Sequence, residues 1–103
     1  MIEFQILITQ RAFSNINEHV VFARNVSLEA AKELYEETVS SLRSLSSFPE
    51  RYPEIPGLRI AGARVRKMPI HDGHYVALYK IDAGTAVVYD VIDTRKDGIL
   101  NKL

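Results

Sequence analysis

Residues 75–93 decide the fold, and they read YVALYKID-AG-TAVVYDVID. Two strand-like runs flank the dipeptide Ala83-Gly84, which supplies the turn residues with positive φ that a tight hairpin needs. The second run is apolar on both of its alternating faces, at Val87, Val88, Val91 and Ile92. A strand with two apolar faces is expected to be central in its sheet and covered.

A third strand-like run precedes this hairpin. It reads RVRKMPI over residues 64–70, and the dipeptide Asp72-Gly73 provides the turn that follows it. Residues 49–57 come earlier and contain three prolines and one glycine, which predict an ordered but irregular loop. The apolar side chains expected to anchor this loop are Phe48, Tyr52 and Ile55.

The first half of the chain reads as one strand and two helices. Apolar and polar residues alternate over residues 2–8, which predicts a strand, and apolar residues then recur at helical spacing from Phe13 to Ala23. A second helix is expected to begin after Ser27, a good N-cap, and to end at Phe48-Pro49. Its expected buried stripe has spacings of three and four residues and consists of Leu28, Ala31, Tyr35, Thr38, Leu42 and Leu45.

The order strand, helix, helix, strand, strand, strand predicts an α+β fold. We expect the two helices to form a hairpin that packs on one face of a mostly antiparallel four-stranded sheet. The first strand needs a neighbour for its apolar face, and the last strand is the candidate, so these two strands are expected to run parallel. A chain of this length is expected to form a single domain over residues 1–103.

Charge and composition exclude several classes of protein. Thirteen basic and thirteen acidic side chains give no net charge, which argues against binding nucleic acid by bulk electrostatics. The segment from Arg59 to Lys67 nevertheless holds four basic residues and no acid. The absence of cysteine excludes disulfide frameworks, zinc–thiolate sites and cysteine nucleophiles. No signal-peptide pattern or membrane-spanning apolar run is present, so a cytoplasmic protein is expected.

Five short motifs, in this order, resemble the RelE/ParE superfamily of bacterial toxins. They are L-x-x-F-P at 45–49, R-Y-P at 51–53, R-K-M-P at 66–69, Y-x-x-x-Y-x-I-D at 75–82 and I-x-x-R-x-D at 92–97. Each motif alone is weak, but the five together extend over most of the chain. The resemblance implies the toxin of a type II toxin–antitoxin, or plasmid stabilisation, system, which inhibits bacterial growth and is neutralised by a small cognate antitoxin.

The resemblance leaves the target open. RelE-like members cut messenger RNA on the ribosome, ParE-like members poison DNA gyrase, and a degenerate member would bind its antitoxin without being toxic. Operator DNA would be reached only through the antitoxin. None of these activities calls for a metal or another cofactor, so none is expected.

A metal-free ribonuclease needs a base, a group that stabilises charge on the phosphate and an acid. If the chain is a nuclease, the expected catalytic residues are Arg66, Arg95 and His74. The residues expected to contact a target or an antitoxin are Arg64, Arg66, Lys67, Arg95 and Lys96.

Each of these residues also has a purely structural interpretation. Arg64 and Arg66 could form the solvated face of an edge strand, where charge prevents sheets from associating. Arg95 could pair with Asp93 or Asp97 on the surface. The two histidines that flank the 71–74 turn could have no chemical role.

Three features favour the ParE-like function over RNA cleavage. The position after Tyr75 is often arginine in nucleases of the superfamily, but here it is Val76. Residues 97–103 contain no tyrosine or histidine that could act as an acid or a base. Ribosome-directed members also tend to be strongly basic, whereas this chain is neutral.

Overall fold

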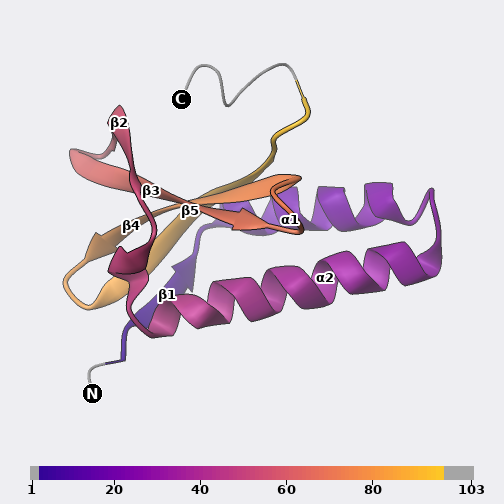
Figure 1. Ribbon diagram of the computed structural model, residues 1–103, viewed down its shortest axis with the longest axis horizontal. Helices are drawn as coiled ribbons and strands as arrows, with labels where there is room; N and C mark the ends of the chain where they lie inside the picture. The colour runs from indigo at the N-terminus through magenta and orange to yellow at the C-terminus, as the bar shows by residue number, and fades with distance from the viewer. Residues whose placement is uncertain (1–2, 97–103) are drawn as a thin grey trace.

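The computed structural model describes residues 3–96 and contains one sheet and a helical hairpin (Figure 1). The elements are β1 (Gln5–Ile8), α1 (Gln10–Ala23), α2 (Leu28–Arg43), two 3₁₀ turns at Ser44–Ser46 and Pro49–Arg51, β2 (Glu54–Ile60), β3 (Ala63–Ile70), β4 (Tyr75–Asp82) and β5 (Thr85–Asp93). The strand order is β1-β5-β4-β3-β2. As expected, β1 runs parallel to β5, and the other neighbours are antiparallel.

The sheet has five strands, so the expectation of four was wrong. The additional strand, β2, begins inside the segment that was expected to be an irregular loop. Pro56 and Gly57 conceal its alternating pattern, but a proline is tolerated on an edge strand, where one side of the backbone has no partner. The dipeptide Ala61-Gly62 joins β2 to β3 with positive φ at both residues, as Ala83-Gly84 does between β4 and β5.

Hydroxyl side chains fix the start of each helix. Thr9 caps α1 by accepting a hydrogen bond from the Ala12 amide at 3.1 Å. Its own hydroxyl donates to the Tyr89 carbonyl at 2.8 Å, which attaches the start of α1 to β5. Ser27 caps α2 as expected, accepting from the Ala30 amide at 2.9 Å.

Neither α1 nor α2, nor any other helix in the described part of the chain, has the length and apolar character that a membrane-spanning helix needs.

The main core lies between the helical hairpin and one face of the sheet. The buried helical residues are Ala12, Ile16, Ala31, Leu34, Thr38, Leu42 and Leu45. The stripe expected on α2 is therefore only partly correct, because Leu34 replaces Tyr35, which is exposed together with Leu28 and Phe13. Leu28 is exposed because it begins α2. Figure 1 shows that the α1–α2 turn projects past the end of the sheet, so the first turn of α2 has no strand beneath it.

A second, smaller core covers part of the opposite face of the sheet. It contains Ile55, Val65, Val76 and Leu78, with Ile92 packed against it. Ile55 is buried and anchors its segment as expected, but Phe48 is exposed and adopts positive φ, so its expected anchoring role was wrong. Helix α2 also ends at Arg43, earlier than expected, and continues as a 3₁₀ turn that buries Leu45.

Two leucines from the expected stripe give a matched stability test. Leu45 is 0% exposed and Leu28 is 74% exposed. Leu45→Ala is expected to lower the free energy of unfolding by about 2–5 kcal/mol, because it leaves a cavity in the main core. Leu28→Ala is expected to change it by less than about 0.5 kcal/mol. Urea unfolding of both variants measures the difference, and equal losses would contradict this assignment of the core.

Candidate functional site

Arg66 holds the segment between the helices and β2. Its guanidinium donates hydrogen bonds to the carbonyls of Glu50 and Tyr52, at 2.8 and 2.6 Å, and lies 3.5 Å from the Glu54 carboxylate. Strand β3 lies between β2 and β4, so the interpretation of this arginine as part of an edge strand was wrong. Arg66 therefore links β3 to the backbone of the segment before β2; we call this link, with the Tyr79 contact described next, the brace.

Tyr79 completes this brace from the neighbouring strand. Tyr79 on β4 is the cross-strand partner of Arg66 on β3. Its side chain is fully buried, and its hydroxyl donates a hydrogen bond to the Pro49 carbonyl. Burial raises the pKa of the Tyr79 hydroxyl to about 12, although the nearby Arg66 and Arg51 charges lower it. The hydroxyl therefore stays protonated at neutral pH and remains a hydrogen-bond donor.

The other basic residues of β3 are exposed and divided between its two faces. Arg64 lies on the same face as Arg66, and its guanidinium donates to the Glu54 carboxylate at 3.1 Å. Lys67 lies on the opposite face, because side chains alternate along a strand. The three basic residues expected on β3 therefore do not form one patch.

Arg95 is fixed at the other end of the sheet by a two-point contact with Asp93. Its Nε lies 3.0 Å from Asp93 Oδ1 and its Nη2 lies 3.1 Å from Oδ2. The same Nη2 donates to the Tyr75 hydroxyl at 3.3 Å. The surface pairing expected for Arg95 is thus present with Asp93, while the alternative partner Asp97 lies outside the described residues, as does the 97–103 segment.

The Asp93–Arg95 contact shifts the pKa values of both groups. Burial raises the pKa of Asp93, but hydrogen bonds from the Arg95 side chain and amide, together with nearby positive charge, leave it below the usual value of 3.8. Hydrogen bonding to Asp93 raises the pKa of Arg95. Arg95 is therefore a permanently charged group held in one orientation.

All three histidines of the chain gather around Tyr75. The His19 ring lies 4.8 Å from the Tyr75 ring, the His71 ring lies 6.5 Å from it, and the His74 ring lies 5.4 Å from the His71 ring. A hydrogen bond of 2.7 Å joins His19 Nε2 to the Val91 carbonyl, and His71 Nδ1 lies 3.0 Å from Glu37 Oε2. We call Tyr75, Asp93, Arg95 and the three histidines the Tyr75 cluster.

The Tyr75 cluster contains two of the three expected catalytic residues, Arg95 and His74, but not Arg66. Arg66 pairs with Tyr79, whereas Tyr75 pairs with Ile70, four residues farther along β3, or roughly 13 Å of strand. Lys96 lies at the margin of the cluster: its amide donates to the Asp93 carbonyl at 3.3 Å, and its ammonium lies 5.6 Å from the Phe22 ring on α1.

His19 was not expected from the sequence. A single histidine in a helix carries no motif, and only the packing of α1 on β5 brings it to Tyr75. Within residues 3–96, no three histidine, aspartate or glutamate side chains are arranged to hold a metal ion.

Comparisons with known proteins agree on the family and the fold. A family model described as the ParE toxin of the type II toxin–antitoxin system parDE matches residues 6–98. The structure is similar to the chromosomal ParDE toxin–antitoxin system from P. aeruginosa, with a TM-score of 0.71, 12% identity and coverage of 88% of this chain and 96% of that one. It is also similar to the toxin–antitoxin complex RelBE2 from Mycobacterium tuberculosis, with a TM-score of 0.52, 23% identity and coverage of 90% and 93%. No curated protein sequence matches.

The lowered pKa of Asp93 predicts a pH-dependent contribution to stability. The ionised carboxylate is stabilised in the folded state, so its contribution is present above pH 3.8 and is lost as the pH falls through the lower pKa of the folded protein. Asp93→Asn is expected to lower the free energy of unfolding by about 1–3 kcal/mol at pH 7 and by less near pH 3.

Urea unfolding at both pH values measures this difference. Asp82→Asn, at an exposed position at the end of β4, is the control and is expected to have little effect. An Asp93→Asn deficit that is equally large at both pH values would contradict the ionic origin of the contact.

Proposed function

This chain belongs to the family of ParE toxins of type II toxin–antitoxin systems, and we propose that it inhibits bacterial growth by poisoning DNA gyrase. A cognate antitoxin is the expected partner of such a toxin. The family model supports the ParE-like function directly, because it matches most of the chain. The two similar solved structures support the same fold.

The observation that carries the gyrase proposal is the separation of the expected nuclease residues. Arg66 donates to backbone carbonyls at one end of the sheet, whereas Arg95 and His74 lie at the other end. Val76, where superfamily nucleases often have arginine, is buried in the smaller core on the face opposite Tyr75. A nuclease that used all three of these residues would need them around one phosphate, and this arrangement does not bring them together.

The projecting end of the helical hairpin is the surface that we assign to the target. Four large apolar side chains are exposed there: Val21, Phe22, Val26 and Leu28. Exposed apolar groups gathered on a small protein are typical of an interaction surface. Lys96 lies against Phe22 and adds a positive charge beside them. For the antitoxin, the candidate contacts are the exposed residues Arg64 and Lys67, with Arg95 as a further candidate at the other end of the sheet.

RNA cleavage is the second candidate function, and the Tyr75 cluster is the observation that favours it. Arg95 could stabilise a phosphate, and the Tyr75 hydroxyl lies 3.3 Å from its guanidinium. His19 and His74 could carry protons to and from the ribose and the leaving oxygen. A degenerate member that binds its antitoxin without toxicity is the third candidate.

Expression of the chain alone in a bacterium separates the three functions. The gyrase proposal predicts growth arrest with a DNA-damage response and double-strand breaks that map to gyrase sites. Sequencing of RNA ends from the same culture is expected to show no new ribosome-dependent cuts. Messenger RNA cut on the ribosome would support the nuclease instead, and normal growth would support the degenerate member.

Phe22 gives a direct test of the target surface. Phe22→Ser is expected to reduce growth arrest strongly, because it removes the largest apolar group from the projecting end of the hairpin. Phe48→Ser is the matched control, since Phe22 is 59% exposed and Phe48 66%, and Phe48 lies outside the hairpin. Growth curves with equal toxin levels measure both variants. Full toxicity of Phe22→Ser would contradict the assignment of this surface.

A further inference from the structure

Two arginines face each other across the hairpin that joins β2 to β3. Arg59 and Arg64 are direct cross-strand partners, and like charges in such a pair repel each other. Arg64 donates to the Glu54 carboxylate at 3.1 Å, whereas Arg59 donates a long hydrogen bond of 3.4 Å to the Gly62 carbonyl. Among residues 3–96, no carboxylate lies within ion-pair distance of Arg59. The hairpin therefore holds a positive charge that its described neighbours do not neutralise.

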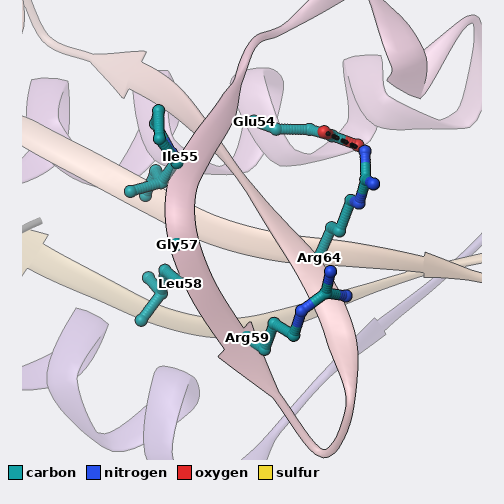
Figure 2. Close-up of a pocket in the computed structure, with 7 residues that line it drawn as sticks. Glu54, Ile55, Gly57, Leu58, Arg59 and Arg64 are labelled. Carbon is teal, nitrogen blue, oxygen red and sulfur yellow. Dashed lines mark hydrogen bonds and ion pairs between the residues drawn. The ribbon is translucent and has the colours of Figure 1, made fainter.

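A hollow of about 360 Å³ lies beside this pair, bordered by Glu54, Arg59, Arg64 and residues 55–58. It exists because β2 bows away from β3: five residue steps on β2, from Glu54 to Arg59, span only two steps on β3. Figure 2 shows Glu54, Arg59 and Arg64 on one side of β2, with Ile55 and Leu58 on the other. One side of the bowed strand is thus charged, while the other carries apolar side chains.

The surrounding contacts hold this hollow in place before any ligand arrives. Arg66 binds the carbonyls of Glu50 and Tyr52 just before β2, and the Lys67 amide donates to the Pro53 carbonyl at 3.1 Å. Ile55 is buried in the smaller core. A site whose backbone is already ordered loses less conformational entropy on binding.

The chemistry of the pair fits a carboxylate. The planar guanidinium fork matches a carboxylate in shape and charge, and Arg64 already donates one hydrogen bond to the Glu54 carboxylate. Arg64 and Arg66 share the Glu54 carboxylate, and no described carboxylate pairs with Arg59, so the positive charge here can accommodate a further carboxylate. A nucleic-acid strand would need a longer basic track, yet the sequence pI is about 6.8 and Arg66 is engaged with the backbone. Strand β2 is at the edge of the sheet, where an extended peptide can lie.

We propose that Arg59 and Arg64 bind a carboxylate side chain in an acidic, extended segment of the antitoxin. This inference rests on the proposed function, because that function supplies the antitoxin as partner. The bound carboxylate bridges the two guanidinium groups, relieves their mutual repulsion and places the antitoxin segment along the outer edge of β2. Arg59 is the residue that distinguishes this site, because Arg64 already has a carboxylate partner.

Fluorescence anisotropy with two probes tests the site on the full-length chain. The probes are fluorescein-labelled hexaglutamate and the purified product of the open reading frame beside the toxin gene, taken as the antitoxin. Arg59→Gln is expected to raise the dissociation constant for both probes by about tenfold, with the larger effect at low salt. Arg59→Lys keeps the charge and is expected to give an intermediate value. Arg24→Gln, at an exposed arginine after α1, is the control and is expected to bind normally.

Circular dichroism establishes that each variant is folded before its affinity is compared. Hexaglutamate and antitoxin binding that is unaffected by Arg59→Gln would overturn the proposal. If labelled oligothymidylate binds more tightly than hexaglutamate, and this binding depends on Arg59, the proposal is overturned and the ligand of the site is a nucleic acid. A wild-type chain that binds the antitoxin through Arg59 but does not arrest growth would defeat the toxin function and leave this site standing. Growth arrest by the wild type, with normal antitoxin binding by Arg59→Gln, would overturn this site and leave the toxin function standing.

Discussion

The hydrogen bonds from Arg66 and Tyr79 to the segment before β2 are the constraint on which the rest of the structure depends. Tyr79 is fully buried in the middle of β4, and its hydroxyl reaches the Pro49 carbonyl. Arg66 binds the next carbonyls along, those of Glu50 and Tyr52. An unsatisfied polar group at such depth would cost about 1–3 kcal/mol, so these contacts fix where the chain crosses from the helical hairpin to the sheet.

That crossing point determines which charges are available for function. Because Arg66 is bound to backbone carbonyls and Lys67 lies on the other face of β3, the basic residues of this strand do not converge on one point. From this crossing point β2 begins beside the smaller core and bows away from β3. The bow leaves Arg59 and Arg64 at an open edge. At the far end of the sheet Arg95 is oriented by Asp93 and joins the histidines around Tyr75. The fold therefore places these arginines at opposite ends of the sheet, with Arg59, Arg64 and Arg66 near β2 and Arg95 beside Tyr75.

The sequence predicted the parts of the fold that depend on local patterns. The Ala83-Gly84 turn, the Ser27 cap and the parallel pairing of β1 with β5 follow from turn chemistry, capping and apolar faces, and all are confirmed. Strand β2 was missed because a proline and a glycine disrupt its alternation, although the Ala61-Gly62 turn repeated a signal already recognised later in the chain.

Features that depend on packing between distant residues could not be predicted in this way. The sequence could not reveal that Arg66 faces carbonyl groups, because backbone acceptors leave no trace in the sequence. It also could not place His19 beside Tyr75, since only the crossing of α1 over β5 joins them.

Purified gyrase with relaxed plasmid, ATP and the full-length chain tests the central claim, that this ParE-family fold acts on gyrase. The account predicts dose-dependent loss of supercoiling or accumulation of cleaved plasmid. Normal supercoiling at saturating toxin, together with cleavage of messenger RNA on purified ribosomes, would contradict it.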